Sequence, residues 1–186
     1  AGGQIVSLDP DNGSSPVQIA CAIDARDVPA RLPGIAWRAG ADLNPIDPTD
    51  QDQIAWLETL VWPEHTARRD RLHAAATIAA DDPAHLRKGD ILTAIPDLIN
   101  EAPTGANVVV FHSAVLVYLP AERRQEFADQ MLALDDVTWI SNEGPGVFPF
   151  IADQVTKPIG GRTILAVNGK PVALVGPHGQ TYESID

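Results

Sequence analysis

The stretch NVVVFHSAVLVYLP, residues 107–120, carries the strongest strand signal in the chain. It opens with an uninterrupted apolar run that ends at Phe111, which predicts a strand buried on both faces, as in a parallel sheet. Pro120 suits the first turn of a following helix, which we expect to reach Asp135. A second apolar segment at residues 137–140 predicts the next strand. Strand, helix and strand in this order predict a right-handed crossover between parallel neighbours.

The same alternation continues on both sides of this stretch. Apolar spacing predicts further strands and helices, with a kink at Pro96 in the third helix: strands at 35–41 and 85–88, and helices at 49–61, 63–80 and 91–99. Near the C-terminus, an Asn168-Gly169 turn joins residues 163–167 to residues 171–175, which predicts a hairpin. The sequence therefore predicts an α/β fold with a mostly parallel sheet and a C-terminal antiparallel hairpin at one edge.

Residues 1–33 differ in composition from the rest of the chain. They are rich in Gly, Pro, Asp and Ser, with two short apolar segments at residues 5–8 and 17–23 separated by turn-forming residues. We expect an N-terminal hairpin or a pair of edge strands here, followed by one α/β domain over residues 34–186. The first residues, Ala-Gly-Gly-Gln, are neither an initiator methionine nor a signal peptide. The chain is therefore expected to be a processed product or part of a longer protein.

The composition excludes several classes of function. The 186 residues include 25 acidic and 13 basic side chains, for a net charge of −12, which argues against binding to nucleic acid or to anionic lipid. The single cysteine cannot form an internal disulfide, and the 5 histidines show no metal-ligand spacing. No apolar run approaches the ~20 residues that span a bilayer. We therefore expect a cytoplasmic protein without a metal, a nucleic-acid partner or a membrane partner.

Polar residues follow each predicted strand, at the end where open α/β sheets bind their ligands. In chain order these candidate site residues are Asp42, Asn44 and Asp47; Asp90; His112, Ser113 and Tyr118; and Ser141, Asn142 and Glu143. The loop that begins at Asn142 also contains two glycines, which allow the backbone to approach a ligand closely. The alternative for this loop is an ordinary turn.

Several candidates have an alternative structural role. Asp47 and Asp90 precede helical patterns, where aspartate commonly caps a helix N-terminus. Asp42 could accept hydrogen bonds from a ribose diol, or it could stabilise a turn. His112 could contact a ligand, or it could be a buried, hydrogen-bonded histidine. Ser113 could also be the nucleophile of a serine hydrolase with His112 as its base. Two observations argue against this option: neighbouring strand residues point to opposite faces, and no Gly-x-Ser-x-Gly motif surrounds the serine.

The chain also lacks the usual nucleotide-binding turns. Neither Gly-x-Gly-x-x-Gly nor a Walker A motif occurs in the sequence. A nucleotide pocket built by this chain alone would have no phosphate-binding turn of the usual kind.

Four segments carry a resemblance to a known family: WRAGADLNPID at 37–47, LVWPE at 60–64, VFHSAVLVYLP at 110–120 and WISNEGPG at 139–146. With them the chain resembles an uncharacterised bacterial family, domain of unknown function 2332, over most of residues 15–180. That family is similar in pattern to class I S-adenosylmethionine-dependent methyltransferases, which have a Rossmann-like fold. Members usually run longer at the N-terminus, so this chain looks like the C-terminal part, without the first strand of the sheet.

The resemblance implies a function and roles for individual residues. It implies methyl transfer from S-adenosylmethionine to a small-molecule substrate, with Asp42 or Asp47 at the cofactor ribose and Asp90 at the adenine amino group. Asn44 would be a further cofactor-binding residue. His112 would be the catalytic base, and Ser113, Tyr118, Asn142 and Glu143 would contact the substrate or line its loop. The missing N-terminal segment would then complete the pocket as a partner.

The alternative function is non-catalytic. The chain would be a degenerate Rossmann-like module that has lost its cofactor and acts through a protein partner. The missing glycine-rich turn favours this alternative.

Overall fold

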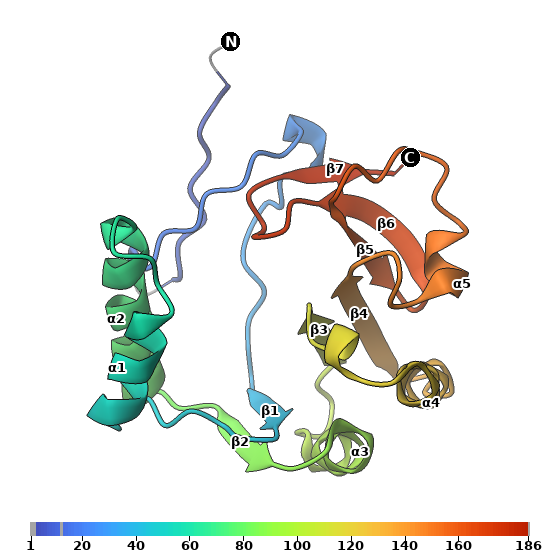
Figure 1. Cartoon of the computed structure of the whole chain (residues 1–186), viewed down its shortest axis with the longest axis horizontal. Coiled ribbons are helices and arrows are strands. Elements are labelled where there is room, and N and C mark those ends of the chain that lie inside the picture. The colour runs from blue at the N-terminus through green and yellow to red at the C-terminus, as the bar shows by residue number, and fades with distance from the viewer. Residues whose placement is uncertain (1–2, 12, 186) are drawn as a thin grey trace. The chain divides into compact units, whose positions relative to one another are not determined.

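A computed structural model describes residues 3–11 and 13–185 of the chain (Figure 1). The described residues form a mixed α/β structure with two sheets, one parallel and one mixed. They divide into two compact units: the first holds the residues up to Ile19 and Pro29–Leu98, and the second holds Ala20–Val28 and the residues from Ile99 onward. The boundary falls within one helix, α3 (Ile91–Glu101).

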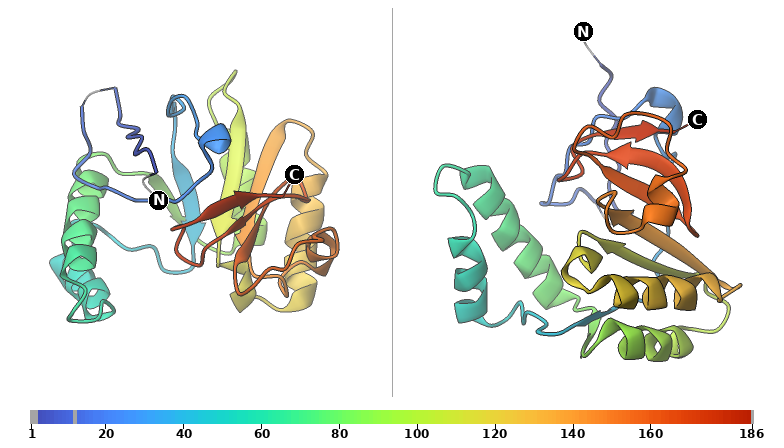
Figure 2. Two further views of the ribbon diagram at one scale, coloured as in Figure 1. Left: turned by 90° about the horizontal axis from the view of Figure 1, so that it is seen from above. Right: turned by 45° about the vertical axis from the view of Figure 1, so that its right-hand side comes forward.

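The first unit is built on a two-stranded parallel sheet. Strand β1 (Ala39–Asp42) pairs with β2 (His85–Lys88), and in their register Asp42 lies beside Lys88. The connection between the strands contains α1 (Gln51–Thr59) and α2 (Thr66–Asp81), which lie side by side (Figures 1 and 2). Neither helix contains a fully buried residue, and Leu72, Ala76 and Ala79 of α2 are half-buried.

The second unit is built on a five-stranded sheet in the order β3-β4-β5-β6-β7. Strands β3 and β4 are parallel, and the other three pairings are antiparallel. The prediction of a mostly parallel sheet is therefore wrong for this unit, because β5, β6 and β7 each run antiparallel to the strand before them. The bounds are β3 (Val108–Ser113), β4 (Val137–Glu143), β5 (Thr163–Val167), β6 (Lys170–Val175) and β7 (Tyr182–Ser184), with helices η1 (Ala25–Asp27), η2 (Leu116–Tyr118), α4 (Ala121–Leu132) and α5 (Pro149–Ala152).

One face of this sheet carries the core of the second unit. Alternate residues of β4 are buried, and Trp139 in its centre has no exposed surface. Phe127 and Met131 of α4, together with Phe148 just before α5, are also buried, and the Phe127 and Phe148 rings pack edge-on against the indole of Trp139. Because side chains alternate between the two faces of a strand, these contacts determine which face of β4 is internal. Figure 2 shows α4 alongside β3 and β4.

The N-terminal hairpin that the composition suggested is not formed. Among the described residues before Ala39 there is only η1 and a single bridge between Ala22 and Thr181. The apolar side chains Ile5 and Ile19 are 94% and 71% exposed. Because they bury so little surface, nothing offsets the entropy cost of ordering two short strands.

Other sequence predictions hold with small shifts. Strand β1 is shorter than expected and ends at Asp42. Helix α1 begins at Gln51 and is capped by Asp50, whose carboxylate accepts bonds from the N–H groups of residues 52 and 53. Helix α3 continues through Pro96. Strand β4 extends three residues further than predicted, to Glu143, which moves Ser141 and Asn142 from a loop into the sheet.

The hairpin of β5 and β6 is confirmed. Asn168 and Gly169 between the strands have φ values of 48° and 74°, as a two-residue hairpin turn of the primed type requires. An ideal Cβ on Gly169 would lie 3.4 Å from side-chain atoms of both Leu132 and Phe150. Gly169 therefore satisfies a conformational requirement and a packing requirement together.

We predict that Gly169→Ala lowers the free energy of unfolding by about 1–2 kcal/mol, because an L side chain is strained at positive φ. Urea unfolding at pH 7 measures the change. Gly144→Ala is the matched control, since Gly144 has no atom within 4 Å of an added Cβ and no positive φ. Equal losses of stability in the two variants would contradict the prediction.

Candidate functional site

The carboxyl ends of β3 and β4 bring several predicted site residues together. In the parallel register, His112 lies beside Ser141 and Ser113 lies beside Asn142. Alternation along the strands then places His112, Ser141 and Glu143 on the face that carries the core. Ser113 and Asn142 lie on the opposite face. The sheet therefore sorts the predicted residues into two separate groups.

On the core face, His112 joins Trp139 to Glu143. The Nδ1 atom of His112 lies 2.8 Å from Oε1 of Glu143, and Nε1 of Trp139 donates a hydrogen bond of 3.0 Å to Nε2 of His112. The side chains of His112 and Glu143 are only 9% and 3% exposed. An indole N–H can only donate, so Nε2 must accept and the ring proton is on Nδ1. His112 in this arrangement is a neutral imidazole with both nitrogens hydrogen-bonded.

Glu143 also binds the backbone of the loop that follows β3. Its Oε1 atom accepts hydrogen bonds from the N–H groups of Val115 (3.0 Å) and Leu116 (3.1 Å). The loop can reach it because Ala114 adopts a φ of 52°, while its own N–H donates to the carbonyl of Asn142. A non-glycine residue in the left-handed region is uncommon and is held there by its surroundings.

The hydrogen bonds keep Glu143 ionised in spite of its burial. Burial raises the pKa of the carboxyl group, but hydrogen bonds from His112 and from the N–H groups of Leu116 and Val115 outweigh it, so the pKa lies below its ordinary value. The second carboxylate oxygen, Oε2, is buried and has no hydrogen-bond partner among the described residues. All of the hydrogen bonds described for this carboxylate are therefore made by one of its oxygens.

On the opposite face, three neighbouring strands contribute a row of polar side chains. The amide Nδ2 of Asn142 donates to Oγ of Ser113 (3.0 Å), and the hydroxyl of Thr163 on β5 donates to Oδ1 of Asn142 (2.6 Å). Ser113 is exposed at the end of this row. Because His112 points to the other face, it cannot act as a base for Ser113. The geometry therefore does not supply the dyad that a serine hydrolase needs.

Tyr118 lies apart from both groups. Tyr118 is the last residue of η2 and is 86% exposed. Its backbone N–H donates to the carbonyl of Val115. The structure gives no hydrogen bond for its hydroxyl group.

The remaining predicted residues belong to the first unit. Asp42 accepts a hydrogen bond on Oδ1 from the N–H of Asn44 (2.7 Å), which closes a turn directly after β1. Asp47 accepts bonds from the hydroxyl and the N–H of Thr49, and these bonds lower its pKa. Asp90 accepts from the N–H of Leu92 and so caps α3.

Asp42 ends β1, and Asp90 lies two residues after the neighbouring strand β2. The N–H of Gly89, the residue after β2, donates to the carbonyl of Asp42 (2.9 Å), so the chain passes beside Asp42 one residue before Asp90. Asp42 is exposed and Asp90 is half-buried. These two carboxylates therefore lie at the same, carboxyl-terminal edge of the β1-β2 sheet.

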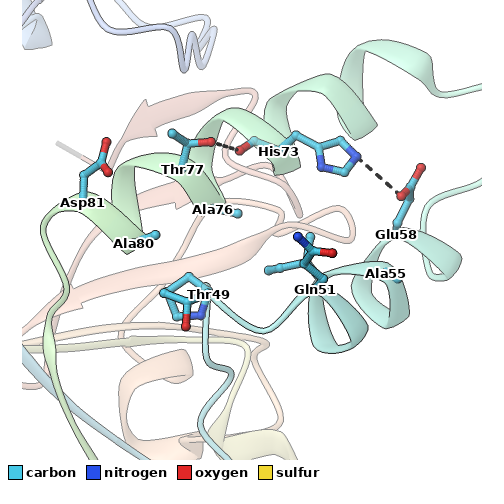
Figure 3. Close-up of a pocket in the computed structure, with 11 residues that line it drawn as sticks. Thr49, Gln51, Ala55, Glu58, His73, Ala76, Thr77, Ala80 and Asp81 are labelled. Atoms are coloured by element: carbon cyan, nitrogen blue, oxygen red, sulfur yellow. Dashed lines mark hydrogen bonds and ion pairs between the residues drawn. The ribbon is translucent and has the colours of Figure 1, made fainter.

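The first unit also has an open pocket, lined by polar and apolar residues alike, that the sequence did not predict (Figure 3). It has a volume of about 480 Å³ and lies between α1 and α2, where Glu58 and His73 meet at 3.4 Å. Arg69 also contacts Glu58, at 3.5 Å. Glu58 lies on α1 and His73 lies on α2, so only the packing of the two helices brings these side chains together. In the described part of the chain no group of three or more metal-ligating side chains gathers here or elsewhere.

Trp139 and Thr163 are the residues of the sheet clusters that sequence reasoning missed. Trp139 was expected only as part of a strand, and Thr163 only as the start of a hairpin. Their contacts depend on the register of β3, β4 and β5, which no local motif specifies. Alternation along β4 does place Trp139, Ser141 and Glu143 on one face, which was the available signal.

Comparison with known proteins identifies the family. A family model described as "Uncharacterized protein conserved in bacteria (DUF2332)" matches residues 8–183. The chain belongs to this family. Searches of curated proteins and of solved structures each gave no match. None of the helices described for this DUF2332 chain is both long and apolar enough to cross a membrane.

We predict that Glu143→Gln destabilises the protein at pH 7 by about 1–3 kcal/mol, because it removes charge-assisted hydrogen bonds from a buried site. The folded-state pKa of Glu143 is below its ordinary value of 4.5. Its contribution to stability is therefore present above that pH and is lost as the pH falls through the folded-state pKa. The difference between wild type and variant should narrow between pH 6 and pH 3 in urea unfolding.

Glu126→Gln is the matched control, because Glu126 is an exposed glutamate on the surface of α4. It should change the stability by less than about 0.5 kcal/mol at either pH. A difference for Glu143→Gln that stays constant from pH 6 to pH 3 would contradict the assignment of an ionised Glu143.

Proposed function

We propose that this DUF2332 chain binds S-adenosylmethionine and takes part in methyl transfer to a small molecule in the bacterial cytoplasm. The observation that supports this proposal best is the position of Asp42 and Asp90 at the carboxyl ends of two neighbouring parallel strands. In α/β folds that bind nucleosides, an acidic side chain at this position accepts hydrogen bonds from the ribose hydroxyl groups.

The hydrogen bonds of Asp42 fit that role. Its Oδ1 atom holds the turn at Asn44, and Asp42 itself is the exposed last residue of β1. Asp47 is less suited, because the hydroxyl and the N–H of Thr49 both bind its carboxylate. We therefore assign the ribose contact to Asp42 and the contact with the adenine amino group to Asp90, while Asn44 supports the turn.

Asp42 and Asp90 would hold the nucleoside part of S-adenosylmethionine, and the bound cofactor would supply an electrophilic methyl group. The chain's own contribution would be to hold and orient the reactants. His112 could remove a proton from the nucleophile only after Trp139 releases its Nε2 atom, because that lone pair accepts the indole N–H. Ser113, Asn142 and Tyr118 are the more accessible candidates for contact with a substrate.

A second candidate function is a non-catalytic module that acts through a protein partner. Both ring nitrogens of His112 are hydrogen-bonded inside the core, which favours a structural role for this residue. The sequence also contains no glycine-rich cofactor turn.

We predict that Asp42→Asn weakens binding of S-adenosylmethionine to the chain about tenfold to a hundredfold, since the loss of a charged hydrogen-bond acceptor costs about 1.5–3 kcal/mol. Asparagine keeps a side-chain oxygen for the turn at Asn44. Isothermal titration calorimetry of the full chain with S-adenosylmethionine and with its demethylated product measures the affinity.

Asp52→Asn serves as the control, because Asp52 is exposed in the first turn of α1 and should leave the affinity unchanged. Absence of binding by the wild-type chain would remove cofactor binding by this chain alone and favour the partner-dependent module. Binding that Asp42→Asn leaves unchanged would remove the ribose assignment.

A further inference from the structure

The first unit contains a second pocket, which adjoins the pocket of Figure 3 and shares Pro48, Ile54 and Ala76 with it. Its volume is about 510 Å³, and its walls come from the segment 45–48 after β1, from α1 and α2, and from residues 83–86 at the start of β2. All of these residues belong to the first unit. A pocket of this size is typical of sites that hold a small organic molecule.

The lining of this second pocket is apolar almost throughout. Ile54 and Leu57 line it from α1, Leu72 lines it from α2, and Leu86 lines it from β2. Helix α2 also contributes the alanines at positions 75, 76 and 79, which share one helical face with Leu72. The small alanine side chains leave room beside the larger ones, so the packing of the two helices produces an apolar hollow.

One negative charge lies at this apolar pocket. Among the described residues that line it, Asp47 alone has a polar side chain. Its Oδ1 atom accepts hydrogen bonds from the N–H (2.8 Å) and the hydroxyl (2.7 Å) of Thr49, whereas its Oδ2 atom accepts none from the residues that the structure describes. The bonds from Thr49 lower the pKa of Asp47, so its carboxylate is ionised at neutral pH. An acceptor oxygen is therefore available beside the apolar wall.

We propose that this pocket binds a small apolar molecule that carries a cationic amine. The apolar body would lie against Leu57, Leu72 and Leu86, and the amine would donate to Oδ2 of Asp47. In small-molecule sites of this kind, burial of apolar surface supplies affinity and a few polar groups fix the orientation of the ligand.

The charges of the chain favour a cationic ligand over an anionic one. The Asp47 carboxylate would repel an anion, and the carboxylate of Asp50 is close enough to affect Asp47 and adds to the negative potential. The whole chain carries a net charge of −12, which attracts cations over longer distances. The inference does not rest on the binding of S-adenosylmethionine, because it involves neither Asp42 nor Asp90.

Isothermal titration calorimetry of the full chain without S-adenosylmethionine tests the proposal. The probes are 4-phenylbutylamine, 4-phenylbutanol and 4-phenylbutanoate, which share one apolar body and differ in charge. The amine should bind about threefold to fivefold more tightly than the alcohol, as is typical of an exposed ion pair, and the carboxylate should bind more weakly than the alcohol. Absence of binding by all of the probes would overturn the proposal, and an amine that binds no better than the alcohol would overturn the preference for a cation.

Asp47→Asn tests the contact with the amine. Asparagine keeps an oxygen for the bonds from Thr49 but removes the charge, so the amine should bind only as tightly as the alcohol. Asp70→Asn is the matched control, because Asp70 is exposed on α2 and lines neither pocket. It should keep the preference for the amine. A preference that survives Asp47→Asn would overturn the role of Asp47.

Ala76→Leu tests the location of the site. The larger side chain would fill part of the pocket, so every probe should bind about tenfold more weakly than to the wild type. Ala67→Leu on the same helix is the control, because Ala67 is exposed and lines neither pocket. Circular dichroism checks that both variants are folded. Equal affinities of folded Ala76→Leu and Ala67→Leu for the probes would place the site elsewhere and overturn the proposal.

Discussion

The carboxylate of Glu143 is the point on which the local structure of the second unit depends. A buried charge is tolerated in a protein interior only when hydrogen bonds replace the water that it loses. Three donors meet this requirement at Oε1: the imidazole of His112 and the backbone N–H groups of Val115 and Leu116. They join the end of β4 to the end of β3 and to the loop after it. The left-handed conformation of Ala114 is a consequence, since it turns that loop toward the carboxylate.

The same arrangement determines what His112 can do. With Nδ1 bound to Glu143 and Nε2 bound to Trp139, the ring is held in one orientation and one tautomer. Phe127, Trp139 and Phe148 surround it with aromatic contacts. A histidine held in this way stabilises the sheet, and proton transfer through it would require the contact with Trp139 to open. Chemistry that needs a free base would have to find it elsewhere.

The two units differ in how their apolar surface is covered. In the second unit, α4 and the segment before α5 bury one face of the sheet, and the residues around Ala22 cover one of its edges. In the first unit, α1 and α2 contain no buried residue, and Trp56, Leu60 and Trp62 are all more than 60% exposed.

Local sequence patterns specify most of the secondary structure of this protein. The apolar run before His112, the helix after Pro120 and the Asn168-Gly169 turn each encode their element through propensity and backbone geometry, which neighbouring residues control. The cap at Asp90 is local in the same way, because its carboxylate binds an N–H two residues away. Sheet order and side-chain clusters depend instead on contacts between residues far apart in the chain. Glu143 meets His112 across 31 positions, and β5 returns beside β4 in the antiparallel direction. Only the tertiary structure decides such contacts, because strand register is set by the burial of whole faces and by closure of long connections.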